Sequence, residues 1–160
     1  MAMSGERKRA RWGNGGRRVG GRGKRRESEA GDLAVRAVKA LRDGEVQGGR
    51  ALVDEAIRLA EQSTAMNPSC QQAWAVRSSA HSWRVFLAWT HDRKGDLAAA
   101  RRSADVLMQL APNDSRSYYL RGVVESLTGE FPNSVADLRR AQALNPNDAP
   151  PQFFLSQLEA

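Results

Sequence analysis

The sequence predicts an all-α fold, an α-solenoid of about three helical hairpins and a terminal helix behind a disordered tail. From Asp32 onwards apolar residues recur at three- and four-residue steps, and no segment shows the period-two alternation of a strand. Landmarks also repeat 34 residues apart: Gly95 and Gly129, Leu110 and Leu144, and Pro112 and Pro146. Each unit is therefore a helix, a glycine turn, a second helix and a proline turn. Such units bury their apolar faces only by stacking.

The 160 residues suffice for one domain with a sizeable core, and their charge is unevenly distributed. Residues 1–26 hold ten Lys or Arg and one acid, a net +9, whereas the rest of the chain is −2. The single cysteine, Cys70, excludes a disulfide within the chain and suits a reducing compartment. No apolar run approaches the roughly 20 residues that span a bilayer, and none has the form of a signal peptide. We therefore expect a cytoplasmic protein, or a nuclear one if the source is eukaryotic, without a membrane partner.

Gly- and Pro-marked breaks divide the chain into elements. Residues 1–28 are expected to be disordered, because this Arg/Gly-rich segment has too little apolar surface to offset its ordering entropy. Residues 29–160 form the helical domain, and its helices should pack as antiparallel neighbours because the breaks are short. The expected helices are, in order, Asp32–Asp43, Arg50–Met66, Gln71–Arg93, Leu97–Leu110, Ser115–Leu127, Asn133–Leu144 and Gln152–Leu158.

These units resemble the tetratricopeptide repeat, a helical hairpin with a period of 34 residues. Counted from His81 and from Ser115, the small residue of the motif's first helix falls on Ala88 and Gly122. The turn falls on Gly95 and Gly129. The units implied are 32–68, 71–112 and 115–146, followed by a terminal helix at 150–159. A weaker similarity links the chain to C-terminal repeat regions of bacterial signalling proteins such as adenylate cyclases and transcription regulators.

The sequence departs from the motif in two ways. Arg84, Arg121 and Glu125 stand where the first helices usually carry an aromatic residue or leucine, so we expect the packing there to shift register by one residue. Pro68 and Pro112 are 44 residues apart, ten more than one period. We expect these ten residues to lengthen the first helix of that unit by nearly three turns.

The resemblance implies a concave groove, formed by the first helices, that binds a peptide or a partner helix. Trp89 and Tyr119 would be adjacent there with arginines beside them, which is typical of binding hot spots. The alternative is that the aromatic residues Trp74, Trp83, Phe86 and Trp89 belong to the core. Family members that clamp a terminal carboxylate use Lys and Asn, and neither occurs at the matching positions. The groove residues expected from the resemblance are Val85, Trp89, Arg93, Arg116, Tyr119 and Val123.

Residue patterns for catalysis or metal binding are lacking in the sequence. His81 and His91 are ten residues apart, about 15 Å along one expected helix, which is too far to share a metal ion. Cys70 has no histidine near it on the same helical face. The segment GNGGRRVGGRG neither follows a strand nor opens a helix, as a phosphate-binding loop does. We therefore expect no enzymatic activity, no metal and no cofactor.

The basic tail allows two functions and one neutral interpretation. Arg/Gly segments bind RNA or DNA through phosphate charge and arginine stacking. The same run could be a nuclear-targeting signal, or an extension without function that begins at an upstream start codon. The candidate polyanion contacts are Arg17, Arg18, Arg22, Lys24, Arg25 and Arg26.

The function that the sequence favours is a non-catalytic scaffold for protein–protein interaction through the groove. The alternatives are a nucleic-acid-associated protein that binds through its tail, and a regulatory fragment of a larger bacterial signalling protein. The terminal helix takes the place of a first helix in a further repeat. We expect Phe154 and Leu158 to pack on Asn133–Leu144, and Phe153 to stay partly exposed and support a homodimer.

Overall fold

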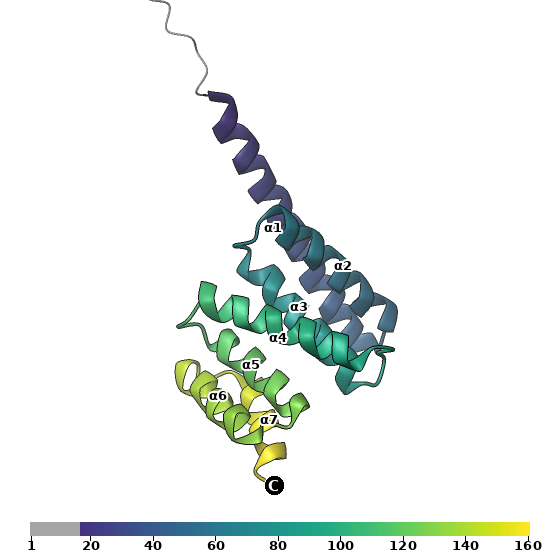
Figure 1. Cartoon of the computed structure of the whole chain (residues 1–160), viewed down its shortest axis with the longest axis vertical. Coiled ribbons are helices and arrows are strands. Elements are labelled where there is room, and N and C mark those ends of the chain that lie inside the picture. Colours follow the sequence, from purple (N-terminus) through teal and green to yellow (C-terminus); the bar gives the residue numbers. More distant parts are fainter. Residues whose placement is uncertain (1–16) are drawn as a thin grey trace, which may run out of the picture.

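The computed structural model describes residues 17–160, with side chains from residue 20 onwards, and this part of the chain is all-α (Figure 1). The predicted fold class is confirmed. The described helices are α1 (Arg17–Gln47), α2 (Arg50–Met66), α3 (Gln71–Phe86), α4 (Arg93–Leu110), α5 (Ser115–Thr128), α6 (Phe131–Leu144) and α7 (Ala149–Leu158).

The helices form three consecutive hairpins, α1–α2, α3–α4 and α5–α6, and α7 packs on α6 and α5. The first helices contact one another in chain order, α1 with α3, α3 with α5 and α5 with α7. They therefore make one layer of the solenoid, and α2, α4 and α6 lie behind it. This order is the one that the 34-residue spacing predicts.

Small residues hold the two helices of each hairpin close together. In each hairpin one buried serine donates its hydroxyl hydrogen to a backbone carbonyl of the opposite helix. Ser63 donates to Ala30 at 2.7 Å, Ser78 to Ala100 at 3.0 Å, and Ser134 to Gly122 at 2.7 Å. A buried hydroxyl with a partner avoids the desolvation cost of an unsatisfied group, so these serines pack as the small residues of the motif do.

The long helix expected at Gln71–Arg93 is wrong, because α3 ends at Phe86. Ala88 adopts the left-handed conformation with φ 54°. The Trp89 N–H donates to the Arg84 carbonyl at 2.8 Å and the Ala88 N–H to the Val85 carbonyl at 3.2 Å. This is a Schellman ending, which usually has glycine at the left-handed position and is recognised in sequences by that glycine. Because alanine occupies that position here, the sequence does not indicate the end of the helix.

The ten additional residues of this unit are consequently spread over three places. α3 has 16 residues and α5 has 14, α4 has 18 and α6 has 14, and the connection 87–92 is longer than 129–130. The expected equivalence of Ala88 with Gly122 is therefore wrong. Counted from the helix starts, Ser78 of α3 is the equivalent of Gly122 in α5.

Gly95 is also not the turn that its spacing predicted, since it lies in the first turn of α4. Asp92 caps this helix, and its Oδ1 accepts the Gly95 N–H at 2.8 Å. A Cβ at Gly95 would lie 2.1 Å from Asp92 Oδ2. The glycine is thus needed to let the capping side chain close over the helix end.

The first helix differs most from its expected bounds. Gly44 was expected to end it, but α1 continues to Gln47, and a Cβ at Gly44 would lie 2.9 Å from Val53 Cγ2 of α2. Gly44 therefore allows α1 and α2 to approach closely. The turn between them contains Gly48 in the left-handed conformation, at φ 66°. At the other end α1 begins at Arg17, so residues 17–28 are helical rather than disordered. Adding turns to a helix already packed from Ala30 onwards costs less than nucleating one. Residues 1–16 of the predicted tail lie outside the described residues.

Ionic contacts replace apolar packing at two of the three positions that depart from the motif. In the α3–α4 hairpin, Oδ1 of Asp96 lies 3.4 Å from Nη1 of Arg84. The same oxygen lies 2.6 Å from Nδ1 of His81. In α5–α6, Arg121 forms a bidentate pair with Asp137, with Nη2 2.9 Å from Oδ1. Buried charges are tolerated when they are paired in this way.

Glu125, at the third departure, is buried near Asp137 without a pairing cation of its own. Burial, and then repulsion by Asp137, raise its pKa from 4.5 to about 7, although Arg121 opposes the shift. Its Oε2 has no hydrogen-bond partner among the described residues. The protonated form of Glu125 is therefore more favoured in the folded state than in the unfolded chain.

We predict that Glu125→Gln stabilises the protein above neutral pH. A raised folded-state pKa gives stability that is fully present below about pH 4.5 and is lost as the pH rises through about 7. The substitution should raise the free energy of unfolding by about 1–3 kcal/mol at pH 8, because solvent screens part of the shift, and leave it little changed near pH 4.5. Urea unfolding at both pH values measures this difference, and an equal effect at both would contradict it.

Candidate partner-binding groove

Three adjoining hollows run along the layer of first helices, and together we call them the groove. The central hollow lies between α3 and α5 and reaches Phe154 of α7. It shares Ser79, Tyr119 and Leu120 with a hollow beside α1, and Phe86, Leu127 and Phe154 with a hollow beside α7. The groove is therefore continuous from α1 to α7. Its further lining residues are Val38, Leu41, Gln72, Ala75, Val76, Ser82, Trp83, Arg116, Val123, Ser126, Phe153, Gln157 and Leu158.

Aromatic side chains dominate the centre of the groove. Trp83 and Phe86, one turn apart on α3, stack edge to face with ring centroids 5.7 Å apart. Tyr119 of α5 meets Phe154 of α7 at 5.9 Å, and Phe154 meets Phe153 at 5.6 Å. Edge-to-face pairs hold the rings in fixed orientations, so the aromatic surface is preformed.

The residues that line the groove carry almost no unpaired charge. Arg116 is the one charged residue that lines it in the described part of the chain. Its guanidinium donates two hydrogen bonds to Oδ2 of Asp114, the N-cap of α5, from Nη2 at 2.7 Å and from Nε at 3.1 Å. These hydrogen bonds lower the pKa of Asp114, whose carboxylate offsets the charge of Arg116. Burial, with Glu45 and Asp148 nearby, raises the pKa of Tyr119 to about 12, so its hydroxyl stays neutral at physiological pH.

Of the six groove residues predicted from the sequence, Arg116, Tyr119 and Val123 lie together in the groove, all on α5. The other three do not line it. Val85 is buried in the hairpin. Trp89 follows the end of α3 and packs against the core that α1, α2 and α3 form together. Arg93 begins α4, where its Nη2 donates to the Leu127 carbonyl at 3.2 Å. The early end of α3 explains the error, since these positions were counted along a helix that extended to residue 93.

The sequence allows Trp74, Trp83, Phe86 and Trp89 to belong together to the core, and the structure divides that set. Trp83 and Phe86 line the groove, whereas Trp74 packs beside Leu107 and Leu120 and donates its indole N–H to the Pro68 carbonyl at 2.7 Å. Counting the α3 unit from Gln71 instead of His81, in register with Ser115, would have placed Ser79 and Phe86 on the same face as Val123.

The terminal helix contributes to the groove in a way that the sequence did not indicate. Pro151 and Leu155 are its buried residues. Phe154, expected to pack on α6, contacts Tyr119 of α5 and lines the groove, and Leu158 lines the hollow beside α7. Phe153 is 57% exposed.

The histidines and the cysteine form no reactive cluster in the described range. His81 is buried against Asp96, His91 lies in the connection between α3 and α4, and Cys70 precedes α3. No three His, Cys, Asp or Glu side chains among residues 20–160 are grouped closely enough to hold a metal ion. In the same range no helix has both the length and the apolar character that crossing a membrane requires.

Solved structures with a similar arrangement are tetratricopeptide-repeat (TPR) domains. The first TPR domain of human RPAP3 superposes with a TM-score of 0.64 at 20% identity, over 83% of this chain and 91% of that domain. The fold is TPR-like. The TPR domain of Arabidopsis OM64 gives 0.64 at 14% identity, over 83% and 96%. The first TPR of Spaghetti (RPAP3), solved with the HSP90 peptide SRMEEVD, gives 0.64 at 19% identity, over 83% and 92%.

Sequence comparisons add nothing to this structural similarity. No family model matches the chain. No curated protein matches it either.

Proposed function

We propose that this protein is a non-catalytic scaffold that binds an apolar segment of a partner protein in the groove. The observation that carries the proposal is the continuous, aromatic-lined hollow formed by α1, α3, α5 and α7. Exposed, preformed aromatic surface next to polar residues is typical of protein-binding sites. TPR-like neighbours that bind peptides, such as Spaghetti with its HSP90 peptide, support the same use of the fold.

The chemistry of the groove favours a different ligand from that peptide. The peptide SRMEEVD is acidic and ends in a carboxylate. An acidic ligand needs free cations, and here the charge of Arg116 is already offset by Asp114. The ligand that fits is a segment, such as one face of an amphipathic helix, that inserts apolar side chains between Trp83, Phe86 and Tyr119.

Two phenylalanines offer a matched test. Phe86 is 56% exposed and lines two of the hollows, whereas Phe131 at the start of α6 is 53% exposed and lines none of them. Phe86→Ser should weaken partner binding by at least tenfold, about 1.4 kcal/mol, because an aromatic anchor is lost. Phe131→Ser should leave binding within twofold. Equal affinities of the two variants for a purified partner, measured by calorimetry, would contradict the assignment of the groove.

Phe153 extends the exposed aromatic surface at the α7 end, beside Phe86, and we propose that it supports self-association at high concentration. Sedimentation of the wild-type chain should then show a monomer–dimer equilibrium that Phe153→Glu shifts to monomer, because a buried charge would oppose the contact. A monomer at every concentration tested would remove this proposal and leave the peptide groove unaffected.

A further inference from the structure

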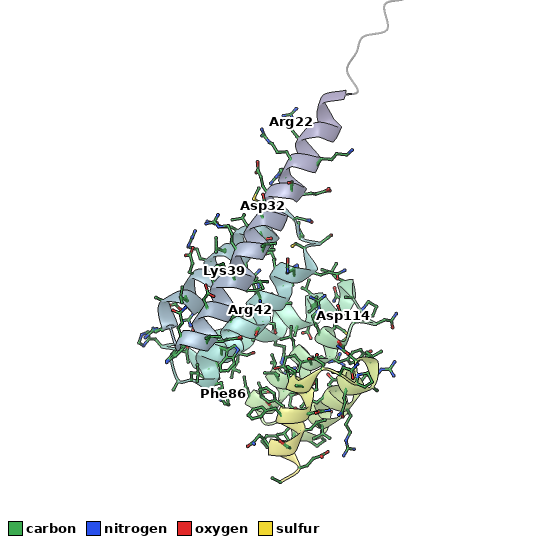
Figure 2. All side chains as sticks on the ribbon, turned by 180° about the vertical axis from the view of Figure 1, so that it is seen from behind. Arg22, Asp32, Lys39, Arg42, Phe86 and Asp114 are labelled. Atoms are coloured by element: carbon green, nitrogen blue, oxygen red, sulfur yellow. The ribbon has the colours of Figure 1, made fainter. Side chains whose placement is uncertain are left out.

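The N-terminal part of α1 stands free of the rest of the protein. Figure 1 shows the purple end of α1 projecting beyond all other helices, and Figure 2 places Arg22 on this projection, whereas Lys39 and Arg42 lie where α1 runs along the body. Residues 20–29 are all exposed, and the first buried residue is Ala30. Ten residues make about 15 Å of helix with solvent on every side.

The charge of this projection is concentrated and positive. Arg22, Arg25 and Arg26 are three and four positions apart, so they share one face of α1. No acid occurs between Glu6 and Glu27, while further along α1 residues 27–47 hold five acids and three bases, so the positive charge is confined to the projection. Among the side chains of residues 20–29 the structure shows one ion pair, Arg25 with Glu29 at 3.6 Å, which is exposed and contributes little.

The composition of the projection distinguishes among anionic partners. A helix that lies on a membrane needs an apolar face, and residues 20–29 contain only glycine, charged residues and one serine. A-form RNA has a deep, narrow major groove that a helix cannot enter. The major groove of B-DNA is about 12 Å wide and admits an α-helix.

We propose that the projecting part of α1 docks in the major groove of duplex DNA through phosphate contacts from its arginine face. The contacts are to the backbone, so the binding is not sequence-specific. The site is separate from the aromatic groove, which leaves the groove free to hold a protein partner while α1 is bound.

The test compares two triple variants of the full-length chain that remove the same charge from the same helix. Binding to a 30-base-pair duplex is measured by fluorescence anisotropy at several salt concentrations. Arg22→Gln, Arg25→Gln and Arg26→Gln together should weaken binding at least tenfold and reduce the slope of log affinity against log salt by about 2–3. Arg36→Gln, Lys39→Gln and Arg42→Gln, on the packed part of α1, should change affinity by less than about threefold.

A second set of variants tests whether the projection binds DNA as a helix. A Cβ at Gly20, Gly21 or Gly23 would meet nothing within 4 Å, so changing all three to alanine raises helicity without a clash. This variant should bind the duplex several-fold more tightly, and Gly23→Pro, which breaks the helix but keeps every charge, should bind several-fold more weakly. Neither should alter the melting of the body.

Four results would overturn the proposal. They are equal losses from both triple variants, no loss from either, unchanged affinity in the glycine variants, and tighter binding to single-stranded RNA, anionic vesicles or polyglutamate than to the duplex. Tighter binding to one of those competitors would reassign the projection to that partner.

Discussion

Replacing Asp96 with alanine is expected to lower the free energy of unfolding by about 3–5 kcal/mol, the largest effect of any single substitution considered for this protein. Asp96 is 5% exposed, and its Oδ1 lies 2.6 Å from His81 and 3.4 Å from Arg84. Its removal would leave the buried His81 ring without its carboxylate, and would leave the Arg84 charge with only its contact to Asp54, at 3.6 Å. The loss of an acid from the first turn of α4 adds a smaller unfavourable contribution.

Urea unfolding of Asp96→Ala beside Asp105→Ala measures this effect. Asp105 is an exposed residue of the same helix, so its variant controls for the removal of one negative charge from α4. Asp105→Ala should change stability by less than about 0.5 kcal/mol. A similar, small loss in both variants would show that the buried ionic contacts do not hold α3 to α4.

The second large effect is expected from Gly122→Leu, at about 3 kcal/mol, or a fall in melting temperature of roughly 10 °C. A Cβ at Gly122 would already lie 3.0 Å from Leu138 Cγ and 3.2 Å from the Ser134 carbonyl oxygen. Ser134 also donates its hydroxyl to the Gly122 carbonyl at 2.7 Å, so the two helices cannot separate without losing that bond. The helix propensity that leucine gains over glycine, about 1 kcal/mol, is too small to compensate.

Gly31→Leu is the matched control, because Gly31 is inside α1 and a Cβ there would meet nothing within 4 Å. That variant should be as stable as the wild type or slightly more so. If Gly122→Leu melted at the same temperature as Gly31→Leu, the close approach of α5 to α6 at this position would be wrong.

The sequence predicted most of the helices because their ends carry recognisable residues. The bounds of Arg50–Met66 were predicted without error, since an Asn-Pro turn follows the helix. The second helices of the last two units were also located well, through their closing prolines. Proline and left-handed glycine end helices for reasons that depend on the local backbone alone.

The end of α3 could not be read in the same way, and the groove depended on it. The left-handed residue there is Ala88, and the ending is stabilised by Trp89, which packs on the core. Tertiary contacts, rather than a local signal, decide the conformation. Because the sequence predicts a helix that reaches residue 93, it also predicts Val85, Trp89 and Arg93 on the groove, whereas Ser79, Trp83 and Phe86 line it. On α5, whose end has Gly129 in the left-handed conformation, the predicted Arg116, Tyr119 and Val123 do line the groove.

The most direct measurement of groove binding is photo-crosslinking from one position inside the groove and one outside it. One photoreactive amino acid replaces Ser79, which lines the central hollow, and the other replaces Ala136, which is exposed on α6 and lines no hollow. Nuclease-treated extract of the source cells supplies the partner, and mass spectrometry maps the crosslinked segment. We expect position 79, but not 136, to crosslink to one discrete apolar segment, and the additional change Phe86→Ser to abolish that product. The same products from both positions, or a product from position 79 that survives Phe86→Ser, would contradict binding in the groove.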